Sequence, residues 1–128
     1  MENYNWDKAQ VAKVGARSKE ERVIIRANGT FHLNSAFIRN NDIISKKYVK
    51  ALIIKGEDKT AIGLVFLNKE EKGESLTLAW GKNKINAGFS GRSILSEAKI
   101  NLPEKSIILP PKIQEYNDDK IYVIELKK

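Results

Sequence analysis

The chain has 128 residues, the length of one ordinary domain. It contains no cysteine, which excludes disulfides, thiolate nucleophiles and cysteine-ligated zinc, and its single histidine, His32, excludes a metal site built from several imidazoles. With 41% hydrophobic residues it can form a packed core, and no apolar run approaches the ~20 residues that cross a bilayer. The lack of cysteine and of a signal-peptide pattern predicts a cytoplasmic protein with no membrane contact and no cofactor.

The net charge of +7 predicts a polyanionic partner, because a basic surface attracts nucleic acid, anionic membranes and acidic proteins. Between Lys8 and Lys50 the chain holds ten basic and three acidic residues. This window therefore carries the whole excess, and the rest of the chain is neutral on balance. A basic composition that serves only solubility is the alternative interpretation.

The first 20 residues are polar and are expected to form an N-terminal arm, followed by a single domain over 21–128. β-Branched and alternating apolar runs predict the strands. They are expected at 21–26, 31–33, 47–55 and 61–67 in one half of the chain, and at 76–80, 85–89, 106–109, 112–116 and 121–126 in the other. The apolar run 52–54 is expected to be buried on both of its faces.

Several local signals refine these elements. Asn28-Gly29 predicts a hairpin turn in which both residues tolerate positive φ. Asn34 and Ser35 predict an N-cap for a short helix over 35–40, and Ser90 or Ser93 predicts one for a second helix over 92–98. Pro110-Pro111 cannot donate to a ladder, so the strand before them ends there or lies at a sheet edge.

The chain shows the same layout twice. Residues 31–43 and 88–100 each read as a strand end, a polar cap and a short helix, about 57 residues apart. Each is followed by a β-rich run that contains an acidic turn, at 56–59 and 117–120. We therefore predict an α+β fold, mostly β: an antiparallel sheet or barrel with two short helices, built from two ββαββ-like half-repeats. The half-units span about 21–67 and 76–126, with a polar linker at 68–75; chance similarity is the alternative.

The basic window supplies the candidate binding residues. In the strand at 22–26, Arg22, Ile24 and Arg26 share one face by the period of two, and Val23 and Ile25 share the other. An arginine-rich face suits contacts with phosphates, and a solvated strand face is the alternative. The predicted nucleic-acid contacts are Arg17, Lys19, Arg22, Arg26, Arg39, Lys46, Lys47 and Lys50.

Other candidates are weaker signals. Tyr4 and Trp6 offer rings on which bases can stack, whereas Trp80 alternates with Leu76 and Leu78 and is expected in the core. Arg92, at the start of the second helix, is a candidate phosphate contact. The acidic turns hold too few carboxylates for a calcium loop, and no triad pattern accompanies His32, so we expect neither a metal nor an enzyme.

The run from Gly29 through Asn34 to Ile43 resembles the core pattern of the AbrB/MraZ swapped-hairpin family, in which a glycine turn leads to a strand, a short basic helix and a hairpin. The resemblance covers 22–67 and is repeated more faintly at 85–126. The family has arginine, proline and glycine where this chain has Thr30, Asn34 and Asp42. The resemblance implies a DNA-binding β-barrel with Arg22, Arg26 and Arg39 on the DNA side. The repeated unit also resembles PC4/Whirly and PUR-type single-strand binders.

These patterns favour a nucleic-acid-binding protein that contacts phosphates through its basic N-terminal face, with DNA favoured and the strand type open. The alternative is a protein-interaction or inhibitory accessory module, for example from a mobile element, that meets an acidic protein or a second copy of itself in a homodimer.

Overall fold

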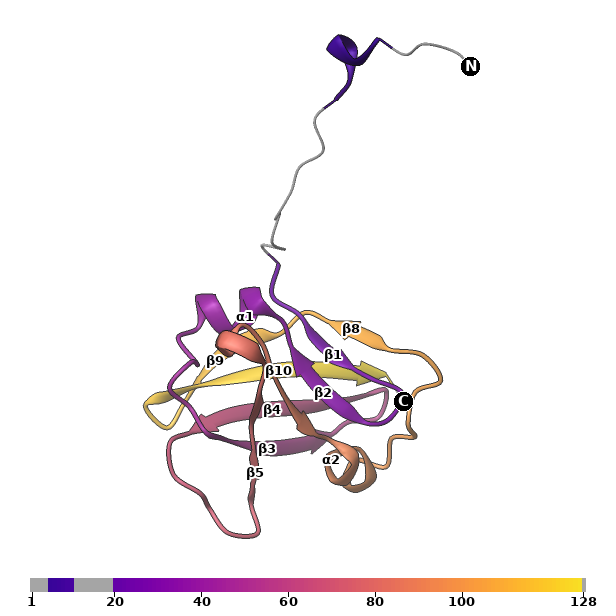
Figure 1. Ribbon diagram of the computed structural model, residues 1–128. Helices are drawn as coiled ribbons and strands as arrows, with labels where there is room; N and C mark the ends of the chain where they lie inside the picture. The colour runs from indigo at the N-terminus through magenta and orange to yellow at the C-terminus, as the bar shows by residue number, and fades with distance from the viewer. Residues whose placement is uncertain (1–4, 11–19, 128) are drawn as a thin grey trace.

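The computed structural model describes residues 5–10 and 20–127, and it is mostly β (Figure 1). The helical elements are η1 (Trp6–Lys8), α1 (Ser35–Asn40), η2 (Lys82–Lys84) and α2 (Arg92–Glu97). The strands are β1 (Val23–Ile25), β2 (Thr30–Leu33), β3 (Tyr48–Lys55), β4 (Lys59–Leu67), β5 (Ser75–Thr77), β6 (Ala79–Trp80), β7 (Ala87–Ser90), β8 (Ile107–Leu109), β9 (Lys112–Tyr116) and β10 (Asp119–Lys127). No helix among the described residues has the length and apolar character that a membrane crossing requires.

The strands form two antiparallel sheets. Sheet A has the order β6-β7-β2-β1-β8, and sheet B has the order β5-β3-β4-β10-β9. The expected α+β fold with two short helices is confirmed, and it takes the form of two sheets without a closed barrel. β8, the strand before Pro110-Pro111, lies at an edge of sheet A as expected.

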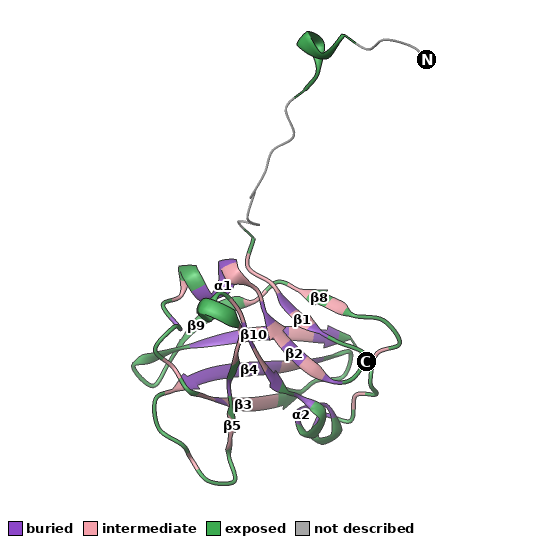
Figure 2. Cartoon of the chain, viewed as in Figure 1, coloured by how far each residue is buried: buried purple, intermediate pink, exposed green. Residues whose placement is uncertain are grey.

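The core lies between the inner faces of the two sheets, where the buried residues of Figure 2 gather. Alternation places Val23 and Ile25 there and turns Ile24 outward, as the sequence predicts. Phe37 of α1 packs on Tyr122 with ring centroids 5.0 Å apart. Since burying one large apolar side chain contributes roughly 1.5–3 kcal/mol, the sheets are held mainly by these contacts.

The strand pairing agrees with the predicted repeat and with an approximate twofold relation between its halves. Phe31 pairs with Phe89 in the middle of sheet A, and Leu64 pairs with Tyr122 in the middle of sheet B. Both pairs are separated by the same distance along the sequence, 58 residues (89 minus 31 and 122 minus 64). β2 therefore lies beside its counterpart β7, and β4 beside its counterpart β10, so the two halves share both sheets.

The two helices end in the same way. Asp42 and Lys99, at equivalent positions after α1 and α2, adopt left-handed φ values of 51° and 57°. Each is followed by an isoleucine that packs on the core, Ile43 or Ile100. Because this conformation costs a non-glycine residue free energy, its occurrence at both positions is evidence that the halves fold alike.

The β1–β2 hairpin forms where Asn28-Gly29 predicts it, with a different turn from the one expected. Only Gly29 has a positive φ, at +89°, and its N–H donates to the carbonyl of Arg26 at 2.8 Å. Arg26 in turn donates its N–H to the carbonyl of Thr30 at 2.9 Å. These bonds close a three-residue loop ending in a left-handed glycine, which also suits the twist of two strands.

Two other local expectations are wrong. The expected strand 76–80 is two short strands in different sheets, β5 and β6, because the chain changes sheet at the buried Leu78. The N-cap of α2 is Gly91, with no side-chain cap, instead of Ser90 or Ser93. A Cβ at residue 91 would overlap the ring of the buried Phe31, so only glycine fits there.

Candidate nucleic-acid interface

The outer face of sheet A carries the predicted arginine pair. Arg22 and Arg26 flank β1 and point to the side opposite the buried Val23 and Ile25. The neighbouring strands add small or neutral residues to this face. Its outward positions are Arg22, Ile24, Arg26, Thr30, His32, Ala79, Gly88, Ser90 and Ile108. None of these nine residues is acidic, although the Arg22 guanidinium is paired with the carboxylate of the neighbouring Glu20.

Arg92 lies against the tip of the β1–β2 hairpin. The side chain of Arg92 lies over Gly29, where an added Cβ would come within 2.6 Å of its Cγ. Its Nε donates to the carbonyl of Asn28 at 2.8 Å. The rest of the exposed guanidinium keeps donors for a ligand. The predicted phosphate contact thus lies at the same tip as one of the predicted nucleic-acid contacts.

At the other end of β1, Asn34 fixes the start of the folded domain. Its side-chain oxygen accepts from the N–H groups of Phe37 and Arg22, each at 3.0 Å. Its amide donates to the carbonyl of Glu20 at 2.8 Å. Asn34 therefore caps α1 as predicted and also holds residues 20–22 beside that helix, while the Arg22 guanidinium pairs with the Glu20 carboxylate.

The imidazole of His32 lies on this face, next to Ile24 across the β1–β2 pair. Partial burial, and then the positive charge of Arg26, hold its pKa below the usual value of 6.5. It is therefore neutral at pH 7 and able both to donate and to accept a hydrogen bond.

Arg39, Lys47 and Lys50, which were expected to extend the face, lie away from it. Arg39 lies in the last turn of α1 beside a hollow of about 490 Å³ that Lys84 and Asp42 also line. Lys47 is exposed just before β3, which belongs to sheet B. Lys50 lies on β3 with its ammonium 3.6 Å from the Glu71 carboxylate and 3.9 Å from that of Glu74. The polar linker thus neutralises Lys50.

The aromatic candidates are also separated. Trp80 is half-buried, donates its Nε1–H to the carbonyl of Lys46 at 3.0 Å and lies under the Lys84 ammonium, which fits the expected packing role. Trp6 is 77% exposed in η1. Tyr4, Arg17 and Lys19 lie outside the described residues.

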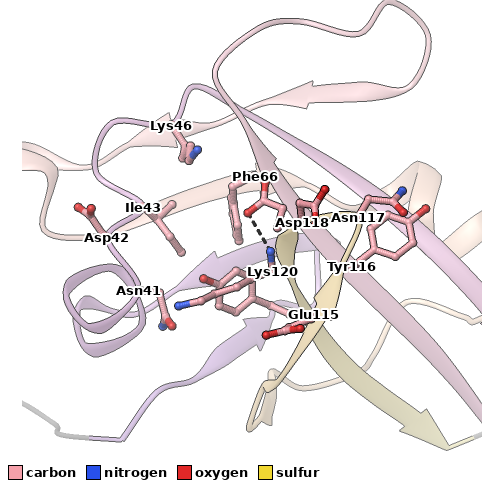
Figure 3. A pocket seen from close by; sticks show the side chains of 12 residues that line it. Asn41, Asp42, Ile43, Lys46, Phe66, Glu115, Tyr116, Asn117, Asp118 and Lys120 are labelled. Atoms are coloured by element: carbon pink, nitrogen blue, oxygen red, sulfur yellow. Dashed lines mark hydrogen bonds between the residues drawn. The ribbon is translucent and has the colours of Figure 1, made fainter.

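A cleft of about 650 Å³ lies where the end of α1 approaches the β9–β10 turn (Figure 3). Lys46 and Lys120 line it, together with the carboxylates Asp42, Glu115, Asp118 and Asp119. The Tyr122 ring is packed against Phe37 and Phe66 at the cleft floor. Burial, and then the negative charges of Asp119 and Glu21, raise the pKa of its hydroxyl. This surplus of negative charge opposes phosphate, so the cleft does not suit a nucleic-acid backbone.

Sequence reasoning missed this cleft, because it forms between segments about 75 residues apart. The acidic turn at 117–120 was visible in the sequence. That Asn41 and Lys46 lie beside this turn follows only from the fold. Among the described residues no group of three or more His, Cys, Asp or Glu side chains is placed to hold a metal ion.

Comparison with known proteins finds no match: no family model, no curated protein and no solved structure is similar to this chain. The resemblances to swapped-hairpin and single-strand-binding families therefore stay predictions.

Proposed function

We propose that the protein binds nucleic acid, with DNA favoured, by contacting phosphates through the outer face of sheet A and the β1–β2 hairpin tip. The observation that carries this proposal is the presence of two exposed arginines, Arg26 and Arg92, at the β1–β2 hairpin, beside a strand face whose outward positions hold no acidic residue. Arg22, at the other end of β1, is paired with Glu20 and would exchange that carboxylate for a phosphate. Arginine donates several N–H groups in a fixed fork that matches phosphate oxygens, and each contact releases condensed counterions.

The shape of the face supports a sugar–phosphate backbone as the ligand. Gly88 and Ala79 lack bulky side chains, so the β6–β7 side of the sheet is low and a chain can approach it closely. Ile24 and Ile108 face each other across the β1–β8 pair and offer apolar contact to sugars or bases. Phosphate contacts position a ligand without reading its bases, so we expect weak sequence preference.

Two further basic residues precede the described part of the domain in the sequence. Asn34 holds Glu20 beside α1, and the sequence immediately before Glu20 contains Arg17 and Lys19. We include both in the proposed set of phosphate contacts because of their charge.

The test is fluorescence anisotropy with labelled single-stranded DNA, duplex DNA and single-stranded RNA between 50 and 300 mM salt. We expect the double variant Arg22→Ala/Arg26→Ala to bind more weakly, with a salt slope reduced by about two because two phosphate contacts are lost. The matched control is Lys69→Ala/Lys72→Ala, which removes the same charge from the exposed polar linker.

The proposal predicts that the control binds like the unmodified protein, and thermal unfolding checks that both double variants fold. Equal weakening in the two variants would show that only net charge matters and would contradict a site on sheet A. Absence of binding at 50 mM salt to all three nucleic acids would overturn the function itself.

A further inference from the structure

The imidazole of His32 stands at the middle of the outer face of sheet A. β2 is the central strand of this sheet, and His32 is paired with Ile24 of β1 on one side and with Gly88 of β7 on the other. Successive side chains of a strand point to opposite faces, so the buried Phe31 and Leu33 turn His32 outward. A polymer that lies across the middle of this face therefore passes over the imidazole.

The surroundings of the imidazole leave it open to a ligand. Gly88 has no side chain to cover the β7 side of the ring, and a Cβ added there would lie only 3.1 Å from the carbonyl oxygen of Phe31. His32 is half-buried, and its side chain forms no hydrogen bond with any residue that the structure describes. Within this part of the chain, both ring nitrogens are therefore available to a phosphate oxygen.

The charged neighbours of His32 on the adjacent strands are arginines. The positions diagonal to His32 on β1 and β7, and next to it on this face of its own strand, are Arg22, Arg26, Asn86, Ser90, Thr30 and Asn34. Diagonal neighbours lie within reach of long side chains, and the carboxylate of Glu20 is paired with Arg22. These surroundings favour the neutral imidazole in the free protein, whereas the negative charge of a bound phosphate favours the imidazolium.

From this geometry we propose that His32 is a further phosphate contact of the nucleic-acid face and takes up a proton when the nucleic acid binds, so that binding strengthens as the pH falls. The inference rests on the proposed function. It adds to the arginines, which stay charged, one contact whose charge depends on pH. An imidazole that only fills its place on the sheet is the alternative.

The direction of the pH dependence follows from proton linkage. Burial and Arg26 lower the pKa of His32 in the free protein, and a bound phosphate raises the pKa in the complex. Affinity is therefore low above the pKa of the complex, rises as the pH falls between the two values, and is constant below the pKa of the free protein. Each unit by which the phosphate raises the pKa gives at most about a tenfold gain in affinity.

The test is fluorescence anisotropy at pH 5.5, 6.5 and 7.5 with labelled single-stranded oligothymidine and duplex DNA, whose bases do not titrate in this range. We expect the unmodified chain to bind about three- to tenfold more tightly at pH 5.5 than at pH 7.5. His32→Gln keeps a hydrogen-bonding side chain that does not titrate, so this gain should be absent. His32→Lys should bind at pH 7.5 as tightly as the unmodified chain does at pH 5.5. Thermal unfolding at each pH checks that the variants fold.

The salt dependence separates a phosphate contact from a structural role. The salt slope of the unmodified chain should be steeper by about one at pH 5.5 than at pH 7.5, and that of His32→Gln should be the same at both. Affinity that does not change with pH, or an equal gain in the unmodified chain and in His32→Gln, would overturn the inference and leave the proposed function standing. Absence of binding at every pH would overturn both.

Discussion

His32 reports on the electrostatics of the outer face of sheet A, and it is the single histidine of the chain. Its pKa is lowered first by partial burial and second by Arg26. Arg26→Ala should therefore raise the pKa of His32 part of the way back toward 6.5, while burial keeps it below that value. Titration of the His32 ring protons by NMR measures the change, with Lys69→Ala as the control. An unchanged pKa would show that Arg26 does not face the imidazole.

The lowered pKa also fixes how stability depends on pH. The folded state disfavours the charged imidazole, so the unfolded chain binds the proton more readily. The contribution of His32 is thus fully present above pH 6.5 and is lost as the pH falls through 6.5 toward the folded pKa. We expect the urea midpoint to fall between pH 7.5 and pH 5.5, and to fall less in His32→Gln. If both proteins lose the same amount, carboxylates govern the loss.

Thr60 shows a different cost at the residue scale. It is fully buried on the inner side of sheet B, and its hydroxyl has no hydrogen-bond partner among the residues that the structure describes. Thr60→Val keeps the shape and removes the unsatisfied group, so we expect a gain of about 1 kcal/mol in the free energy of unfolding, measured in urea. Thr77→Val, at an exposed position of β5, is the control and should change little. A loss of stability in Thr60→Val would indicate an internal water bonded to the hydroxyl.

At the scale of elements, the start of α2 depends on Gly91. A Cβ there would overlap the Phe31 ring and lie 2.8 Å from the carbonyl oxygen of Gly29. We expect Gly91→Ala to destabilise by more than ~2 kcal/mol, because a fully buried ring and the hairpin tip must both move. Gly73→Ala is the comparison, since Gly73 has a φ of +78° and nothing within 4 Å of an added Cβ. It should cost only the backbone strain, about 1 kcal/mol. Equal losses in denaturation would mean that Phe31 moves aside freely.

Most elements could be predicted because their signals are local. Val23 and Ile25 alternate with outward neighbours, and Asn34 is followed by residues that form a helical turn. The change of sheet at Leu78 could not be predicted in the same way. The alternation of apolar and polar residues around Leu78 is that of one continuous strand, and the change of sheet depends on pairing with distant strands. The basic window of the sequence does not form one surface patch for a similar reason. The ammonium of Lys50 pairs with Glu71 and Glu74 of the polar linker, and this contact depends on the fold.

At the scale of the molecule, the two halves are bound by their central strands. β2 pairs with β7 and β4 with β10, so neither half has its own complete sheet. A protease site inserted at Gly73 should allow the chain to be cut without dissociation. We expect the two fragments to co-elute in size-exclusion chromatography and to lose β-structure by circular dichroism once separated in denaturant and diluted singly. A fragment that folds alone would identify two domains.

The candidate interface was only partly predictable at this scale. Arg22 and Arg26 follow from the period of two, but the position of Arg92 at the hairpin tip requires the β2–β7 pair, which brings the second half onto the first. The expectation that the run 52–54 is buried on both faces is wrong, because Ile53 packs against the core while Ile54 is 73% exposed on the outer face of sheet B. A sequence shows that a strand has two apolar faces and does not show whether the second is covered.

The approximate twofold relation between the halves has a consequence for the orientation of a ligand. The halves share their backbone and differ in charge: Asp42 and Lys99 occupy equivalent left-handed positions with opposite signs, and the cap Asn34 has Gly91 as its counterpart. A symmetric surface would accept a polymer equally well in either direction. This one lacks that equivalence, so under the proposed function a nucleic-acid strand lying across the two halves would have one preferred polarity, and a fold made of two like halves would still distinguish 5′ from 3′.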